Sequence, residues 1–181
     1  MRRSLIPIAL VVSGFIVIPP LIHKLFPPEL PAAILSLHER PRQLSLIRFN
    51  DGAGRSITLN HFHGRFILLN VWATWCTPCT EEMASLNRLA SLFDEKDLMI
   101  VPISVDPSGA PTVRAFYSKL DLDRLNIYVD PSKKVMHALT VIGIPTTLLI
   151  DRDGFEIGRS IGAARWDAPT SVTRISDIVG R

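Results

Sequence analysis

Apolar and polar positions along the chain follow two periods, one typical of buried strands and the other of amphipathic helices. Continuous apolar runs at 66–73 and 98–105 predict central strands that are covered on both faces. Between 78 and 93, apolar residues recur at helical spacing and predict one apolar helix face. Strands that alternate with helices in this way favour an α/β domain with a mostly parallel sheet.

Turn signals separate the remaining elements. Residues 44–49 and 57–59 read as a hairpin with Asp51-Gly52 and Gly54 in its turn, and the "DRDG" turn at 151–154 adds a late antiparallel hairpin. The other expected elements are helices over 111–120, 132–139 and 169–179 and strands over 126–129, 146–150 and 155–161.

The N-terminus has the character of a membrane segment. Residues 5–22 carry no charge and approach the ~20 residues that a spanning helix needs. No small-x-small cleavage site follows, so we expect residues 1–23 to be an uncleaved anchor rather than a secretion signal or a buried core helix. Arg2 and Arg3 favour a cytoplasmic N-terminus. The expected location is therefore the bacterial inner membrane, spanned once, with the catalytic domain in the periplasm.

The region after the anchor differs in composition from the rest. Residues 24–43 contain Pro27, Pro28, Pro31 and Pro41 together with several charges, and they are expected to form a semi-rigid linker before a domain at 44–181. The formal charge of +3 is not gathered into a basic stripe with interleaved aromatic residues, so nucleic-acid binding is not expected.

The chain has 2 cysteines, Cys76 and Cys79, and both fall where strand 66–73 gives way to the next helix. Backbone N–H groups and the helix dipole stabilise a thiolate at that position and lower the pKa of a cysteine from about 8.5. Cys76 is therefore the expected nucleophile. Cys79 lies one turn on, within the ~4.4 to 6.8 Å Cα separation that a disulfide needs. A disulfide that closes so short a loop restricts the unfolded chain little and therefore adds little stability, so a reversible redox pair is favoured.

Other uses of the pair remain open at this point. His61 and His63 would complete a zinc site of two cysteines and two histidines, although they lie in a predicted turn. The two thiols alone suit copper(I), and two inert buried cysteines are a third reading.

Two stretches carry a family resemblance. "NVWATWCTPCTEEMASLNRL" and "VDPSKKVMHALTVIGIPTTLLIDRDGFEIGRSIG" resemble the membrane-anchored thioredoxin-like thiol-disulfide oxidoreductases of the TlpA and ResA type, and the similarity runs from about Leu44 to the C-terminus. It implies a thioredoxin fold of the α/β class, with a mixed central sheet flanked by helices and an N-terminal β-hairpin extension.

The resemblance also implies roles for individual residues. Cys76 corresponds to the attacking thiol, Cys79 to the buried resolving thiol, and Pro145 to a cis-proline that packs against their disulfide. Glu82 corresponds to an acidic residue near the pair that acts as base or tunes the thiols, while Asn70 replaces the buried aspartate of ordinary thioredoxins. Substrate contacts are expected at Trp75, Thr77, Pro78, Ile144 and Pro145.

The expected function is the reduction of disulfides in extracytoplasmic proteins by the Cys76–Cys79 pair, without a further cofactor or a metal. The expected partners are disulfide-containing proteins, an upstream membrane thiol donor and, through residues 5–22, the membrane. Copper transfer or oxidase assembly by the reduced pair is one alternative. A reductase for cytochrome c maturation is another, although Thr146 stands where such relatives often carry an acidic residue.

Overall fold

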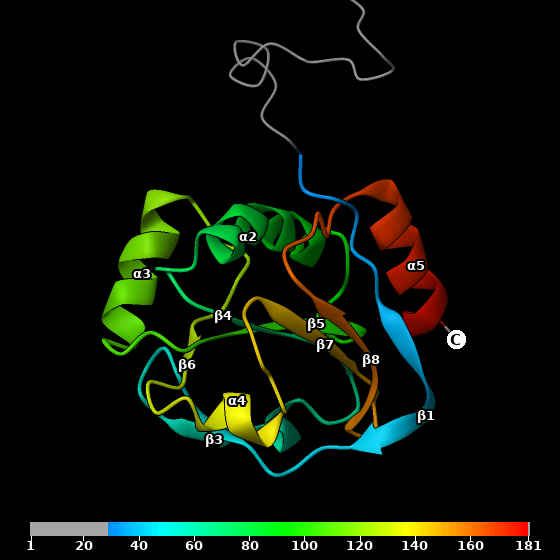
Figure 1. Cartoon of the computed structure of the whole chain (residues 1–181), viewed down its shortest axis with the longest axis horizontal. Helices are drawn as coiled ribbons and strands as arrows, with labels where there is room; N and C mark the ends of the chain where they lie inside the picture. The colour runs from blue at the N-terminus through cyan, green and yellow to red at the C-terminus, as the bar shows by residue number, and fades with distance from the viewer. Residues whose placement is uncertain (1–28, 181) are drawn as a thin grey trace, which may run out of the picture.

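Two apolar strands form the centre of a sheet because their residues can be covered on both faces. They are β4 (Phe66–Trp72) and β5 (Leu98–Ser104), which pair in parallel. All of β5 is buried, as the continuous apolar run predicts. The structure is a computed structural model that describes residues 29–180. Figure 1 shows these strands crossing the middle of the molecule.

The sheet has eight strands in the order β1-β8-β7-β4-β5-β6-β2-β3. Among the described residues, only β4 with β5 and β5 with β6 (Tyr128–Val129) pair in parallel. β7 (Thr146–Ile150) runs antiparallel to both β4 and β8 (Phe155–Ile161). The expectation of a mostly parallel sheet is therefore wrong, because β7 runs antiparallel to the central strand β4 and the strands at both edges of the sheet also pair in antiparallel fashion. The expectation of a mixed central sheet is confirmed.

The predicted N-terminal hairpin is present, although it is shorter than expected. It joins β2 (Arg48–Asp51) to β3 (Ser56–Thr58) and extends the sheet beyond β6. Asp51 accepts backbone N–H bonds from Ala53 and Arg55, and Gly54 takes a φ of 82° that favours glycine. A short 3-10 helix, η1 (Leu59–Phe62), then leads into the central strand.

Helices cover both faces of the sheet. Figure 1 shows α2 (Thr77–Ala90) and α5 (Pro169–Val179) above it and α4 (Lys134–Ala138) below it. A further helix, α3 (Ala110–Lys119), lies toward the β6 end. The buried face of α2 includes Met83, Leu86 and Leu89, as the helical spacing predicts. These apolar contacts hold the start of α2 at the carboxyl end of β4.

The expected linker at 24–43 is partly wrong. Strand β1 (Ser36–Gln43) pairs with β8 and forms an edge of the sheet, and Leu35 just before it is buried. The pairing register shifts between Leu37 and Arg42, a region that includes Pro41, because an edge strand tolerates proline at an irregularity. Most of β1 is exposed, so its sequence lacks the alternation that marks a half-buried strand.

The expected anchor, residues 1–23, lies outside the described residues. From residue 29 to residue 180, no helix is both long enough and apolar enough to cross a bilayer.

The buried side chain of Leu35 gives a direct test of the N-terminal contact. Leu35 is 5% exposed, whereas its neighbour Ile34 is 74% exposed. We expect Leu35→Ala to lower the free energy of unfolding by about 2 to 4 kcal/mol, because it opens a cavity in the core. The matched control Ile34→Ala should change it by less than about 0.5 kcal/mol. Urea unfolding followed by tryptophan fluorescence measures both. If Leu35→Ala changed the free energy of unfolding as little as the control does, this segment would be only a spacer.

Candidate functional site

The two cysteines form a disulfide at the junction of β4 and α2. Their Cα atoms are 5.2 Å apart, within the separation expected from the sequence. Cys76 is the N-cap residue of α2 and retains 7% exposure, whereas Cys79 is fully buried in the first turn. Of the two cysteines, only Cys76 therefore retains exposed surface at which a substrate can approach.

Backbone groups at the helix start favour negative charge on Cys76. Its Sγ atom lies 3.3 Å from the backbone nitrogen of Cys79, which donates to it. Pro78 occupies the first turn, where its missing N–H removes no helical hydrogen bond. When the disulfide is reduced, this amide and the positive end of the helix dipole stabilise a Cys76 thiolate.

A loop that contains a cis peptide bond lies against the disulfide. The Ile144–Pro145 bond is cis, as expected from the resemblance, and the carbonyl oxygen of Ile144 is 3.7 Å from Cys76 Sγ. In the disulfide this sulfur has no proton, so the approach is a contact rather than a hydrogen bond. Thr146 Oγ1 donates to the carbonyl of Gly143, and Gly162 N–H donates to that of Pro145. These bonds fix the loop beside the reactive sulfur.

Exposed side chains flank Cys76 along the chain, and another precedes the Ile144–Pro145 loop. Trp75 is 59% exposed and Ile142 is 88% exposed, and Thr77 and Pro78 are also exposed. The ammonium of Lys133 lies 5.8 Å from the centroid of the Trp75 ring. The residues expected to contact substrate are therefore gathered around Cys76.

Asp106 fixes the segment that precedes Cys76. Its carboxylate accepts hydrogen bonds from the backbone N–H of Thr74 at 2.9 Å and from the hydroxyl of Thr74 at 2.7 Å. Ser104 at the end of β5 donates to the same carboxylate at 2.6 Å. Trp72, which ends β4, is fully buried and stacks on Tyr117, as expected of a residue that packs at the end of the sheet. The hydrogen bonds to Asp106 and the packing of Trp72 thus fix the chain between β4 and α2.

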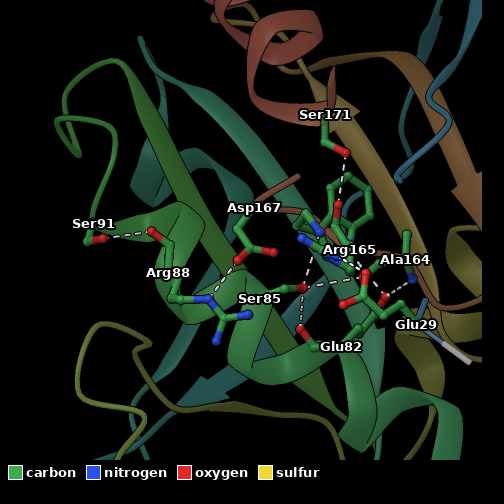
Figure 2. A network of polar contacts seen from close by, with 10 residues as sticks. Glu29, Glu82, Ser85, Arg88, Ser91, Ala164, Arg165, Asp167 and Ser171 are labelled. Carbon is green, nitrogen blue, oxygen red and sulfur yellow. Dashed lines mark hydrogen bonds and ion pairs between the residues drawn. The ribbon is translucent and has the colours of Figure 1, made fainter. Parts of the chain in front are cut away.

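Glu82 is fully buried one helical turn after Cys79. Its Oε1 atom accepts from Asn70 Nδ2 at 2.8 Å, and Asn70 Nδ2 also donates to Thr147 Oγ1 on β7. Its Oε2 atom accepts from Ala164 N–H at 3.0 Å and from Trp166 Nε1 at 3.1 Å. Figure 2 shows Glu82 and Ala164 within the network of polar contacts between α2 and the segment after β8.

Burial raises the pKa of Glu82 to about 7, because desolvation of the carboxylate outweighs the hydrogen bonds from Ala164, Trp166 and Asn70. A carboxyl group with such a pKa exchanges its proton near neutral pH. It lies on the same helix face as Cys79, three residues away, so it is suited to exchange a proton with that thiol.

The structure does not assemble the zinc set considered from the sequence. His61 lines a pocket beside Arg114, and His63 lines a separate pocket beside Asp151, with neither cysteine in either pocket. Within residues 29–180 there is no group of three or more histidine, cysteine or acidic side chains that could hold a metal.

Three contacts of the site were not predicted from the sequence. They come from Asp106, Ala164 and Trp166, and the last had no assigned role. Trp166 lies 84 residues from Glu82 along the chain, and the Ala164 contact is made by a backbone N–H. A backbone donor leaves no signal in side-chain identity. Only the position of Asp106, directly after the apolar run of β5, gave a hint, because carboxyl ends of strands commonly carry functional side chains in α/β folds.

Comparisons with known proteins identify relatives of this site. The model of the AhpC/TSA family matches residues 42–155, more than half of the chain. Thiol-disulfide oxidoreductase ResA of Bacillus thuringiensis subsp. konkukian is 35% identical over 104 residues, which are 58% of this chain and 59% of that protein. ResA of Geobacillus thermodenitrificans is 34% identical over 107 residues, with 58% and 59% covered. The match thus spans about three fifths of each relative's length.

Solved structures share the fold. A protein of Chlorobium tepidum, provisionally named thiol:disulfide interchange protein DsbE, has a TM-score of 0.69 at 22% identity, with 80% of this chain and all of that chain covered. The thioredoxin domain of a thiol-disulfide oxidoreductase from Bacteroides vulgatus has a TM-score of 0.64 at 20% identity, with 78% and 99% covered. The thioredoxin-like fold expected from the sequence is therefore confirmed.

The raised pKa of Glu82 makes stability depend on pH in a defined direction. The ordinary value of 4.5 applies in the unfolded chain, and the folded value is about 7. Native protein therefore binds this proton more tightly, so the stability contributed by Glu82 is fully present below pH 4.5 and is lost as pH rises toward 7. We expect a loss of about 3 kcal/mol across this window, relative to Glu82→Gln, from urea unfolding of the oxidised protein.

Glu82→Gln is a suitable reference because the site accommodates an amide. The glutamine oxygen keeps the bonds from Ala164 and Trp166. Its NH₂ group faces Asn70, whose Oδ1 atom has no hydrogen-bond partner among the described residues and becomes available when that amide flips. Parallel pH curves for the two proteins would contradict a raised pKa at Glu82.

Proposed function

The chain belongs to the AhpC/TSA family, and we propose that it is a thiol-disulfide oxidoreductase that reduces disulfide bonds in exported proteins. The observation that carries the proposal is the asymmetry of the Cys76–Cys79 pair at the start of α2. Cys76 retains 7% exposure and its sulfur accepts a backbone N–H, whereas Cys79 is fully buried one helical turn before a carboxyl group of raised pKa. Its resemblance to ResA supports the same chemistry.

Cys76 begins the reaction. Its thiolate attacks one sulfur of the substrate disulfide, forms a mixed disulfide and releases the other substrate sulfur as a thiolate, which takes a proton from water. The amide of Cys79 and the helix dipole stabilise the attacking thiolate before this step. Cys76 is suited to the role because it is the cysteine of the pair that retains exposed surface.

Cys79 completes the reaction from its buried position. Glu82 accepts the proton of the Cys79 thiol, and the resulting thiolate attacks the sulfur of Cys76. The mixed disulfide breaks, the second substrate thiolate leaves, and the Cys76–Cys79 disulfide forms. The substrate has then gained two electrons from the pair, and its two thiolates take their protons from water, with no further cofactor or metal.

Residues around Cys76 position the substrate. Trp75, Thr77 and Pro78 provide the exposed surface on one side of the sulfur, and Ile144 and Pro145 lie on the other. An extended substrate segment is suited to pair with the backbone of the Ile144–Pro145 loop, in the manner of an added strand.

The proposed location follows from the N-terminal sequence. Residues 5–22 anchor the chain in the bacterial inner membrane with a single pass, and the catalytic domain faces the periplasm. In that oxidising compartment the pair needs an upstream membrane thiol donor to return it to the reduced state.

Thr146 favours a general or assembly-related reductase over one dedicated to cytochrome c maturation. It follows the cis-proline, is 1% exposed, and donates its hydroxyl to the carbonyl of Gly143. It therefore offers a substrate no charge at this position. Both roles use the same thiol chemistry and differ in the partner.

The two cysteines should fail in different ways when they are replaced. We expect Cys76→Ser to abolish reduction of a disulfide-bonded substrate, because a serine hydroxyl is not ionised at neutral pH. We expect Cys79→Ser to accumulate a mixed disulfide through Cys76, because the resolving thiol is missing. Non-reducing gel electrophoresis and mass spectrometry distinguish the two. Retention of reductase activity by Cys76→Ser would overturn the proposal.

The direction of transfer is measured by the redox midpoint of the pair. Equilibration in glutathione and dithiothreitol buffers, followed by the fluorescence of Trp72 and Trp75, should give a midpoint more negative than about −220 mV. A reductase needs such a value to pass electrons to substrates. A midpoint near about −120 mV would make the protein an oxidant instead.

A further inference from the structure

The segment between β8 and α5, residues 162–168, covers the carboxylate oxygen of Glu82 that β4 does not contact. It supplies two hydrogen bonds to one oxygen of the carboxylate, from Ala164 N–H and from Trp166 Nε1, at 3.0 and 3.1 Å. The Trp166 side chain is fully buried, as is Glu82. This pairing lies outside the CxxC motif and the cis-proline loop.

The two carboxylate oxygens of Glu82 have different numbers of donors. Oε2 receives two hydrogen bonds, and Oε1 receives one, from Asn70 Nδ2. Each oxygen of a carboxylate can accept about two such bonds. Oε2 is therefore saturated, and Oε1 keeps one acceptor position for a proton that arrives from elsewhere.

Several hydrogen bonds hold the backbone around Trp166 in place. The backbone N–H of Trp166 donates to Ser85 Oγ on α2 at 3.1 Å, and Ser85 Oγ donates to the backbone carbonyl of Glu82 at 2.7 Å. The preceding residue, Arg165, accepts from Ser171 Oγ on α5 and donates its N–H to the carbonyl of Pro31. Figure 2 shows Arg165, Ser171 and Ser85 around the same segment. The backbone that carries the indole is thus fixed relative to both α2 and α5.

We propose that Trp166 is a positioning residue for Glu82, which fixes the carboxylate so that Oε1 is the atom that accepts the proton of Cys79. The proposal rests on the proposed function of Glu82 as the base in the resolving step. The proton moves from the Cys79 sulfur to Oε1, and the electron pair left on sulfur forms the bond to Cys76. The substrate thiolate leaves, and Glu82 later returns the proton to solvent.

Few other charges act on Glu82. On α2 the titratable groups are Cys79, the exposed Glu81, and Arg88, which pairs with Asp167 at 2.6 Å. Neither β4 nor β7 contains a charged residue, and their polar neighbours here are Asn70 and Thr147. Arg165 and Asp167 are the charged residues of the covering segment. Burial and hydrogen bonds, rather than ion pairs, therefore set the pKa of this carboxyl group.

The test removes the indole N–H in the full-length protein. Trp166→Phe deletes the donor. Benzothienylalanine incorporated at position 166 also deletes the donor but keeps the shape of the indole. This second variant keeps the test valid if the phenylalanine variant does not fold. Carbon-13 NMR of glutamate-labelled protein follows the ionisation of Glu82, whose signal is assigned by its loss in Glu82→Gln. Single-turnover release of the second substrate thiol follows the resolving step against pH.

We expect both replacements to raise the midpoint of Glu82 by about one pH unit, because the ionised form loses a donor. The resolving rate should fall about tenfold at pH 6 and recover at alkaline pH, where the carboxylate forms again. A merely structural loss would not recover. The matched control Asp167→Asn removes the ion pair with Arg88 from the same segment and leaves the donors to Glu82 in place, so it should cause no upward shift.

Two results would overturn the inference, and they are distinguishable. If both replacements at position 166 leave the midpoint and the rate profile unchanged while Glu82→Gln abolishes the pH dependence, Trp166 only fills space and the role of Glu82 stands. If Glu82→Gln retains the wild-type rate profile, the carboxylate is not the base, and its proposed role falls together with that of Trp166. The Cys76→Ser and Cys79→Ser variants test the thiol chemistry separately.

Discussion

A carboxyl group that lies inside a protein requires hydrogen-bond donors, and the donors to Glu82 organise this molecule around its disulfide. An unpaired buried charge is costly, so each donor must be held in place by the fold. Asn70 brings in β4 and, through Thr147, β7. Trp166 and Ala164 bring in the segment between β8 and α5. One buried side chain thus connects the centre of the sheet with its C-terminal helix.

The same arrangement separates the roles of the two sulfur atoms. Cys76 is at the helix start, where the backbone stabilises negative charge and Trp75 and the Ile144–Pro145 loop border an accessible face. Cys79 is buried three residues further along α2, on the same helix face as Glu82. Two cysteines with only two residues between them therefore occupy different environments, one suited to nucleophilic attack and the other to proton exchange.

The N-terminal segment takes part in this architecture. Arg165 forms an ion pair with Glu29 and a backbone hydrogen bond with Pro31, and Ala33 N–H donates to Ser171 Oγ on α5. The region that precedes β1 therefore packs beside the segment that carries Trp166. Contacts that begin at residue 29 reach the buried carboxyl group through two intervening residues, Arg165 and Trp166.

The sequence by itself determined the elements and the reactive pair. Long apolar runs predicted β4 and β5, helical spacing predicted α2, and the position of the CxxC pair at the start of that helix predicted Cys76 and Cys79, because each is a local pattern. The cis bond at Pro145 was implied by the family resemblance of the WCTPC motif and the Ile-Pro-Thr segment. Tertiary structure decided what the pattern does not encode. The exposed edge strand β1 was taken for a linker, since it has no buried face to impose alternation. The sheet was expected to be mostly parallel, whereas β7 lies antiparallel to β4 and β1 adds an antiparallel edge, because pairing between strands far apart in the chain depends on the tertiary arrangement. Trp166 had no assigned role, since hydrogen bonds between residues 84 positions apart depend on how β8, the covering segment and α2 come together.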